Sequence, residues 1–409
     1  MNRKPLEGVK VIDLTWSGAG VFIINFLSHY GATVVRVESA RRPDPIRYSL
    51  TYTEVKNDDP HILERSAVFA FSHPAKKYGM TLDLKNPRAL EVFRKLVAWA
   101  DVVGEAFPTG VMERLGIGYE ELKKIKPDII MMRSCGFGHT GRMAGQPAFG
   151  MTLSAYIMGY SLAGWPDRSP VPVSSYYSDQ LSPLFGMLAL VTALDYRRRT
   201  GRGQCIDQSQ VESSLNYMTP IILDYTVNRR ELTLTGNKCK YAAPHGIYRC
   251  QGDDRWVAIA VFTDEEWKKF CEAIGNPEWS EDSRFATIIG RVKHSDELDK
   301  KVEAWTVNCN AEHVMQTLQR VGISAGVVAN SQDIAEDVQL KHYNYFHELD
   351  HPYMGKINYC HAPAMKLSGA DSDVGRATIL GEHNEYICQE ILGYSHDDYL
   401  NLIRDKVFE

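Results

Sequence analysis

Hydrophobic and polar positions near the start of the chain follow a β-α-β pattern. Residues 9–15 form a short apolar run, residues 21–30 place apolar side chains at helical spacing, and residues 33–37 are mostly β-branched. Glu38 ends this third segment. The pattern predicts two strands joined by a helix.

The same alternation recurs further along the chain. Residues 89–100 have helical spacing and run into a strand-like pair at 102–103, and residues 120–125 precede a strand-like run at 129–132. Alternation of this kind is typical of a parallel sheet covered by helices. We therefore predict an α/β fold for the first half of the chain.

The pattern changes after Gly203. We expect a long helix at 206–222, a polar and turn-rich segment at 228–245, and strands within 248–261. A new unit is therefore predicted to begin near residue 225.

Helical signals follow in this second unit and return near the end of the chain. The segment 263–274 begins with Thr263 as a candidate N-cap and has three acidic residues in its first turn. A strand-like stretch interrupted by prolines at 345–366 leads to a predicted helical segment at 384–405.

Composition and charge narrow the class of protein. The chain has 409 residues, of which 44% are hydrophobic and 24% charged, as in an ordinary soluble globular protein. The net charge of -5 is spread along the chain, so we expect no nucleic-acid partner. The eight cysteines form no CxxC pair, which indicates free thiols rather than a metal site or a disulfide framework.

The sequence also lacks the apolar segments that direct a chain to a membrane. Its first residues lead directly into a strand-like run, and no later apolar run approaches roughly 18 to 20 residues. We therefore expect a cytoplasmic protein with no membrane partner.

The first strand-to-helix turn has the sequence TWSGAGVF, at residues 15–22. Glu38 lies twenty positions after Gly18, as in a dinucleotide-binding fingerprint, but the third glycine of that motif should fall at position 23, which is Ile23. A nicotinamide dehydrogenase is thus disfavoured. A ligand-binding turn at the carboxyl edge of a parallel sheet remains the prediction.

Asp179 stands at the head of an apolar helical segment. Apolar residues at positions 181, 184, 185, 188, 191 and 194 share one helix face, and Pro183 is tolerated in a first turn. Asp179 is then either an N-cap, which contributes on the order of 1 kcal/mol, or a carboxylate nucleophile kept ionised by the helix end. Local physics leaves both interpretations open.

Longer motifs decide between them by resemblance. The sequence resembles the class III CoA-transferases, the family of formyl-CoA and carnitine CoA-transferases, over almost its whole length. In that family the aspartate about twenty residues before the TGRGQ turn is the nucleophile, and here this is Asp179. The matching stretches are LEGVKVIDLT, GATVVRVE, MTLDLKNP, ADVVGEAF, GVMERLGIGYEELKKIKPDII, GFGHTGRMA, LDYRRRTGRGQCIDQSQVESSLNYM, GISAGVV and LGEHN.

The resemblance also implies an architecture. It implies an interlocked dimer, homomeric or with a related subunit, whose chains each have a large Rossmann-like domain built from both termini and a smaller inserted α+β domain. The expected segments are a large domain at 1–200, a linker helix at 201–224, a small domain at 225–325, a linker at 326–349 and a return to the large domain at 350–409.

Site residues follow from the same resemblance. Lys85 and Arg114 suit phosphate groups because both are cationic, although each could also be a solvated surface residue. His139 and Arg142 lie on a glycine-rich loop that either approaches the ligand or is a plain loop. The implied CoA-binding positions are Gly18, Ala19, Leu82, Asp83, Leu84, Lys85, Ala106, Phe107, Arg114, Gln146 and Phe149, and the implied substrate-binding positions are Trp16, Tyr176 and Tyr177.

The implied activity moves CoA from a donor acyl-CoA to an acceptor carboxylic acid through mixed anhydrides and an aspartyl-CoA thioester. Coenzyme A is then a substrate, and neither a permanently bound cofactor nor a metal is expected. Trp16 stands where the formyl-CoA branch has a histidine, and TGNKCKYAAPHG replaces its glycine-rich loop. A bulkier acceptor is implied, such as benzylsuccinate beside an aromatic wall that could include Trp165, with succinyl-CoA as donor.

Two rival functions stay open within the resemblance. A racemase of the same superfamily needs a histidine paired with the aspartate as a second base, and that histidine position corresponds to Phe149. A non-catalytic subunit of a heteromeric transferase is the other alternative, and the presence of Asp179 weighs against it.

Overall fold

The computed structural model describes residues 4–49, 51, 59–172, 176–359, 363 and 365–409. The chain forms two compact units, each with its own hydrophobic core. The first unit joins Met1–Gly159, Pro172–Glu231 and Lys341–Glu409, and the second joins Tyr160–Val171 and Leu232–Leu340. The prediction of a large domain built from both ends of the chain is confirmed.

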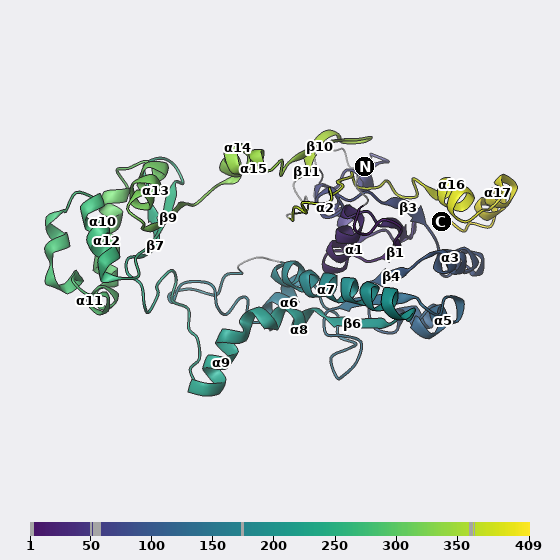
Figure 1. Ribbon diagram of the computed structural model, residues 1–409, viewed down its shortest axis with the longest axis horizontal. Coiled ribbons are helices and arrows are strands. Elements are labelled where there is room, and N and C mark those ends of the chain that lie inside the picture. The colour runs from purple at the N-terminus through teal and green to yellow at the C-terminus, as the bar shows by residue number, and fades with distance from the viewer. Residues whose placement is uncertain (1–3, 50, 52–58, 173–175, 360–362, 364) are drawn as a thin grey trace. The chain divides into compact units, whose positions relative to one another are not determined.

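A six-stranded parallel sheet forms the centre of the first unit (Figure 1). The strand order is β3-β2-β1-β4-β5-β6, so the direction of winding reverses between β1 and β4. Open sheets of this order bind ligands where the winding reverses, outside the carboxyl ends of the strands. The strands are β1 (Lys10–Leu14), β2 (Thr33–Glu38), β3 (Tyr78–Thr81), β4 (Val102–Glu105), β5 (Ile130–Cys135) and β6 (Cys205–Ser209).

Helices cover both faces of this sheet. Successive strand residues point to opposite faces, and both faces carry apolar side chains that the helices bury. On β1, Val11 belongs to the core beneath α1 (Ala19–His29) and α7 (Tyr177–Thr200). Its neighbour Ile12 belongs to the opposite core, beneath α3 (Pro87–Trp99) and α5 (Tyr119–Ile125). The C-terminal segment packs into the same core as Ile12, beneath α3 and α5, through Ile387, Leu402 and Val407.

The long helix predicted at 206–222 is wrong in its first part. Residues Cys205–Ser209 form strand β6, which pairs in parallel with β5 from Met131↔Cys205 onwards. The helical part is broken into α8 (Gln210–Leu215) and α9 (Thr219–Asn228). The apolar spacing of so short a run fits a strand and a helix equally. This segment is a strand because its main chain pairs with β5.

Helix α7 ends at a glycine. Gly201 takes a left-handed conformation (φ 71°) and its N–H donates to the carbonyl of Arg197. Pro183, however, is the seventh residue of the helix and not part of its first turn. Proline has no N–H to donate to the carbonyl four residues earlier, which is that of Asp179.

Helices α1 and α7 approach each other closely through a glycine on α7. A Cβ added at Gly186 would lie 2.3 Å from Ile23 Cδ1. The dinucleotide fingerprint places its close-packing glycine on the first helix, at position 23 here. In this chain the small residue is on the neighbouring helix instead.

The remaining elements of the first unit are short. They include a hairpin of β10 and β11 and several helical segments around the sheet. Their bounds are α2 (Ala67–Ser72), α4 (Val111–Arg114), α6 (Gly150–Tyr156), β10 (His347–His351), β11 (Gly355–Tyr359), α16 (Asn384–Tyr386) and α17 (His396–Arg404), and α15 (Val338–His342) crosses the boundary between the units.

The second unit is an antiparallel sheet of order β7-β8-β9 packed on helices. Tyr248, Val257 and Ile259 point into its core. The predicted N-cap Thr263 is confirmed, because its hydroxyl accepts from Glu266 N in a reciprocal capping box. The elements are β7 (His245–Arg249), β8 (Trp256–Ala260), β9 (Ser324–Val327), α10 (Asp264–Ala273), α11 (Ile288–Lys293), α12 (Ser295–Thr306), α13 (Ala311–Arg320) and α14 (Ser331–Glu336).

This unit also takes in Tyr160–Val171, a segment that the sequence analysis assigned to the first domain. Gly236 N donates to the carbonyl of Gly164 at 3.0 Å, and a Cβ at Gly236 would touch the ring of Trp165. None of the helices described is long and apolar enough to cross a membrane.

Candidate active site

Two adjoining cavities open at the carboxyl edge of the parallel sheet in the first unit. The first, of about 250 Å³, contains Asp179 and is called the Asp179 cavity. The second, of about 360 Å³, is called the adjoining cavity. The residues that line both are Trp16, Arg42, Ala106, Phe107 and Pro108.

Most of the predicted site residues line these cavities. Those of the Asp179 cavity are Gly18, Ala19, Gln146 and Phe149, those of the adjoining cavity are Leu82, Asp83, Leu84 and Lys85, and Trp16, Ala106 and Phe107 line both. The segments after β1, β3, β4 and β5 bring these residues together, because parallel strands end at one edge.

Asp179 is the third residue of α7, and Tyr176 is the N-cap. The N-cap interpretation of Asp179 is therefore wrong. The carboxylate accepts a long hydrogen bond from Ser178 Oγ (3.5 Å) and otherwise faces the cavity that it lines.

Burial changes the acidity of this side chain. Removal from water raises the pKa of Asp179 to about 6, against a weaker opposing effect of the Ser178 hydroxyl. The group is still mostly ionised at neutral pH. A poorly solvated carboxylate of raised basicity is a better nucleophile than one in water.

Two glycines bring the main chain against the Asp179 carboxylate. A Cβ added at Gly18 would lie 2.7 Å from Asp179 Oδ2, and one added at Gly150 would lie 2.9 Å from the same atom. Real Cβ atoms do not approach an oxygen this closely. The carboxylate can therefore be reached only because both positions lack a side chain.

Cations gather at the adjoining cavity. Arg41, Arg42 and Lys85 line it, and the Arg42 guanidinium stacks over the Trp16 ring at 5.5 Å. The two arginines were not predicted as site residues, although they lie three and four positions after Glu38 at the end of a predicted strand. Arg114 is exposed on α4 and lines neither cavity, unlike its neighbours Val111 and Leu115.

The predicted aromatic wall is only partly present at the cavity. Phe149 is 69% exposed and lines it, whereas Tyr177 packs against Leu153 and Ile157 and does not line it. Tyr176 is also absent from the cavity lining, although its ring edge would lie 3.1 Å from a Cβ at Gly150. Trp165 belongs to the second unit.

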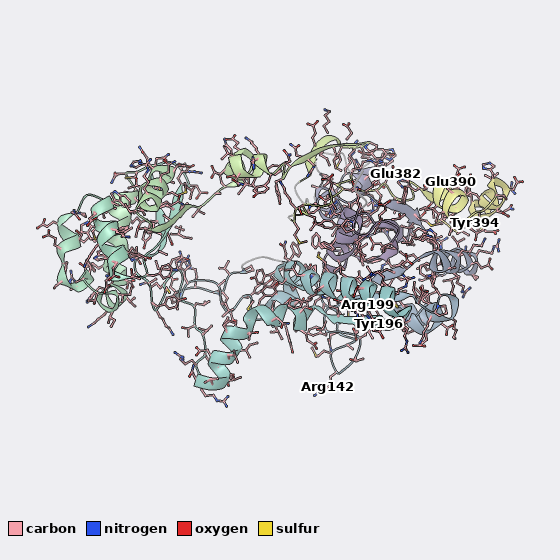
Figure 2. The ribbon with its side chains drawn as sticks, in the orientation of Figure 1. Arg142, Tyr196, Arg199, Glu382, Glu390 and Tyr394 are labelled. Atoms are coloured by element: carbon pink, nitrogen blue, oxygen red, sulfur yellow. The ribbon has the colours of Figure 1, made fainter. Side chains whose placement is uncertain are left out.

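His139 is held by its own neighbours. Its Nδ1 lies 2.9 Å from Asp207 Oδ1 and its Nε2 lies 3.3 Å from Glu105 Oε1. Burial alone would lower its pKa, but hydrogen bonds with Cys135, Glu105 and Asp207 raise the pKa of His139 to about 10. Its ring therefore anchors the loop, and Figure 2 shows Arg142 pointing outwards from that loop.

Glu38 likewise has structural partners. Its carboxylate accepts from Arg36 Nε at 3.2 Å and from Arg47 Nη2 at 2.8 Å. Burial alone would raise its pKa, but these two arginines lower the pKa of Glu38 to about 2. A carboxylate paired in this way is not available for the ribose of a dinucleotide.

Other lining residues were not predicted as site residues, although Gly136, Phe137 and Gln210 lie within the matching stretches. They come from the ends of β4, β5 and β6, which the fold brings to one place. These are Thr109, Ser134, Cys135, Gly136, Phe137 and Gln210.

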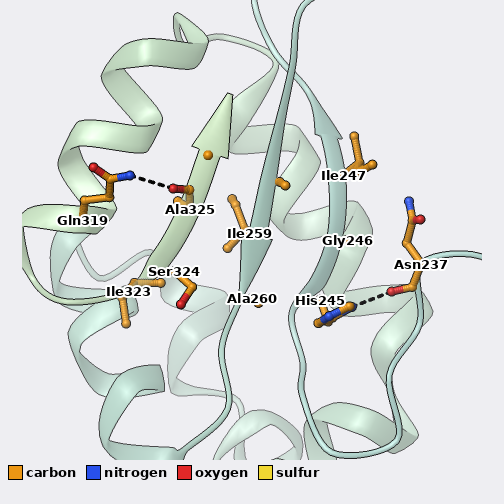
Figure 3. Close-up of a pocket in the computed structure, with 12 residues that line it drawn as sticks. Asn237, His245, Gly246, Ile247, Ile259, Ala260, Gln319, Ile323, Ser324 and Ala325 are labelled. Carbon is orange, nitrogen blue, oxygen red and sulfur yellow. Dashed lines mark hydrogen bonds between the residues drawn. The ribbon is translucent and has the colours of Figure 1, made fainter. Parts of the chain in front are cut away.

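A larger cavity of about 590 Å³ lies on the outer face of the second unit's sheet (Figure 3). Small residues such as Gly246, Ala258 and Gly326 line much of it. Its histidine, His245, lies 2.6 Å from the carbonyl of Asn237 through Nδ1. No carboxylate or thiol is among its lining residues, so the Asp179 cavity is the better candidate for chemistry.

Known proteins similar to this chain show its family. Residues 6–384 match the model of the CoA-transferase family III. The succinyl-CoA–D-citramalate CoA-transferase of Chloroflexus aurantiacus is 30% identical over 405 residues, which are 99% of this chain and 98% of that protein. The succinyl-CoA–L-malate CoA-transferase beta subunit of the same organism is 31% identical over 98% of this chain and 97% of its own.

A solved structure is also similar. A CAIB/BAIF family protein from Brucella suis superposes with a TM-score of 0.85 at 28% identity, over 96% of this chain and 100% of its own. The formyl-CoA:oxalate CoA-transferase of a Bradyrhizobium species is 29% identical over 96% of this chain and 94% of that protein. The chain therefore belongs to the CoA-transferase family III and is an enzyme of that class.

Proposed function

We propose that this enzyme transfers CoA from an acyl-CoA to an organic acid through a covalent intermediate on Asp179. The observation that carries the proposal is the Asp179 carboxylate itself, poorly solvated in a cavity and approached by main chain at Gly18 and Gly150. Covalent catalysis divides one difficult exchange into easier steps.

The first half-reaction loads the enzyme. An oxygen of Asp179 attacks the thioester carbonyl of the donor, and the C–S bond breaks to give a mixed anhydride and CoA thiolate. The thiolate then attacks the aspartyl carbonyl carbon and expels the donor acid as its carboxylate. The enzyme is left as an aspartyl-CoA thioester.

The second half-reaction reverses these steps with the acceptor. The acceptor carboxylate attacks the aspartyl thioester and releases CoA thiolate, and the thiolate attacks the acceptor carbonyl of the new anhydride. The Asp179 carboxylate leaves unchanged. No net proton or ATP is needed, because one thioester replaces another.

Each tetrahedral intermediate needs a donor for its oxyanion. Helix α1 starts at Ala19 beside the cavity, and no side chain caps its N-terminus at Gly18. We propose that the first N–H groups of α1 donate to the oxyanion, because they have no partner within the helix. Removing such a donor typically lowers the rate by about 10²- to 10³-fold.

The adjoining cavity would hold the rest of coenzyme A. Arg41, Arg42 and Lys85 suit its phosphates, because guanidinium and ammonium groups bind phosphate oxygens. The edge-to-face pair of Trp16 and Phe107, with ring centroids 5.7 Å apart, lies where the two cavities share residues. We propose that the pantetheine arm passes this pair.

For the donor we propose succinyl-CoA, which the names of two similar proteins contain. For the acceptor we propose a dicarboxylic acid, with benzylsuccinate as the aromatic candidate, because Trp16 and Phe149 offer ring surface in the Asp179 cavity. A racemase is less well supported, because Phe149 occupies the position of its second base and His139 is held by Glu105 and Asp207.

The trapping of Asp179 tests the proposal. After incubation with succinyl-CoA, hydroxylamine should convert Asp179 alone to a hydroxamate, detected by the mass of its peptide. Asp179→Asn should give no adduct, and Asp195→Asn on the same helix should behave as the parent. Exchange of an α-proton with solvent and no adduct would instead indicate a racemase.

A further inference from the structure

The turn between β1 and α1, residues 15–18, carries groups that stand next to Asp179. Trp16 lines both cavities, and Gly18 approaches the carboxylate. Between them, Ser17 has a φ of 62°, in the left-handed region that residues with a side chain rarely adopt. Such a conformation persists only where the surroundings hold it.

Asp44 holds the strained residue directly. Its Oδ2 accepts a hydrogen bond from Ser17 N at 3.1 Å, and its Oδ1 accepts from Ile46 N at 3.1 Å. The Asp44 side chain has no exposed surface. A buried carboxylate thus fixes the main-chain N–H of a left-handed residue.

Arg36 holds both sides of the same turn. Its Nη2 donates to Asp44 Oδ2 at 2.8 Å, and its Nη1 donates to the carbonyl of Thr15 at 3.1 Å. Asp13 also binds the turn, because its Oδ1 accepts a hydrogen bond from Thr15 N at 2.9 Å. All these side chains are buried, so the contacts are not weakened by water.

The same network extends away from the turn. Lys77 donates to Asp13 at 2.8 Å, and Arg47 bridges Glu38 and Glu64. Glu64 pairs with Arg47 Nη1 at 2.8 Å and accepts a hydrogen bond from Leu380 N at 3.0 Å, and neither partner belongs to residues 15–18. Arg47 and Glu64 thus form a partly buried ion pair that can be changed without altering a direct contact of the turn.

We propose that Asp44 and Arg36 are positioning residues of the transfer centre, which hold Ser17 left-handed and so set where Trp16 and Gly18 stand relative to Asp179. The inference rests on the proposed function. When the contacts of Asp44 and Arg36 with the turn are lost, the turn relaxes and the thioester carbonyl is no longer correctly placed for attack by Asp179. The phosphate contacts proposed for Arg41 and Lys85 in the adjoining cavity do not depend on this turn and remain.

The test compares Asp44→Asn with Glu64→Gln in the full-length enzyme. Asparagine keeps the shape and an oxygen for Ser17 N but loses the charge that Arg36 binds. We expect Asp44→Asn to slow the formation of the Asp179 adduct by about 10- to 100-fold, the scale of a misplaced reactant, with KM for acyl-CoA nearly unchanged. Glu64→Gln should form the adduct at the parental rate.

A second change separates positioning from general damage. Glycine adopts the left-handed conformation without support, so Ser17→Gly should restore most of the lost rate in the Asp44→Asn enzyme. Equal slowing in Glu64→Gln, no rescue by glycine, or a parental rate in a folded Asp44→Asn enzyme would each overturn the proposal. If Asp44→Asn does not fold, Ser17→Val must show the same loss of rate at unchanged KM.

Hydrogen exchange distinguishes failure of the positioning role of Asp44 from failure of the proposed function. The amides of the peptide that contains residues 15–22 should exchange faster in Asp44→Asn than in the parent or in Glu64→Gln. If the parent forms no adduct with any acyl-CoA, the proposed function fails. Unchanged exchange, with an active parent, would refute the role of Asp44 alone.

Discussion

A single carboxylate, Asp179, combines the requirements of catalysis with a cost in stability. Its pKa is raised from 3.8 to about 6 by burial, so the folded state takes up a proton more readily than the unfolded state. Such an acid destabilises the folded protein when it is ionised. The cost, on the order of 3 kcal/mol, is fully present above the folded-state pKa and disappears below the unfolded-state pKa.

We therefore predict that Asp179→Asn stabilises the protein while it abolishes transfer. The free energy of unfolding, measured with urea, should rise by about 1 to 3 kcal/mol at pH 7.5 and by less at pH 5, because Asp179 is largely protonated in the folded enzyme there. Asp195→Asn removes an exposed partner of Arg198 and Arg199 and should change stability by less than about 0.5 kcal/mol. A loss of stability at pH 7.5 in Asp179→Asn would contradict this explanation.

At the scale of elements, the crossing of α1 and α7 sets the position of Asp179. Gly186 lies two turns beyond Asp179 and allows α7 to pack closely on Ile23 and Gln208. Leu190 and Ala193 continue the same buried face, in the core shared with α1. The position of the nucleophile thus depends on a helix contact that lies beneath it.

Gly186→Ala is expected to push the two helices apart. The added Cβ would lie 2.3 Å from Ile23 Cδ1, so we predict a loss of about 1 to 3 kcal/mol in the free energy of unfolding, as for other overpacked cores, together with slower adduct formation. Thr192→Ala, at an exposed position of the same helix, is the matched control and should behave as the parent. If Gly186→Ala is as stable as the parent, α1 and α7 can move apart without loss of stability, which would contradict the prediction.

At the scale of the whole molecule, apolar surface remains uncovered on the first unit. Leu184, Leu188 and Val191 are exposed along one side of α7. Helix α9 has no buried residue among those described, and its Leu223 and Val227 are 54% and 75% exposed. Apolar helix faces of this kind mark protein interfaces, which supports the dimer that the sequence analysis predicted.

We predict that the chain forms a dimer and that these helices contribute to it. Sedimentation should give a mass near 92.4 kDa, twice the 46.2 kDa of one chain, and Leu188→Glu with Val227→Glu should shift it towards the single chain. Glu390→Gln, at an exposed position near the C-terminus (Figure 2), should leave the mass unchanged. A parental protein that sediments as one chain at all concentrations would refute the dimer.

The strands of the sheet were predictable to different degrees. β1, β2, β4 and β5 are rich in apolar residues and were recognised, because both faces of these strands are largely buried. The edge strand β6 was assigned to a helix, since its identity depends on pairing with β5. The strand β3 was missed for the same reason.

The sequence by itself determined the α/β class, the family and the candidate nucleophile Asp179, because these are carried by local periodicity and by motifs in a fixed order. Only the tertiary structure decided that Gly18 and Gly150 meet at its carboxylate and that burial raises its pKa. Likewise, only the fold joins Asp44 to Ser17 and Arg36. Distance and dielectric environment depend on segments far apart in the chain, and no local pattern encodes them.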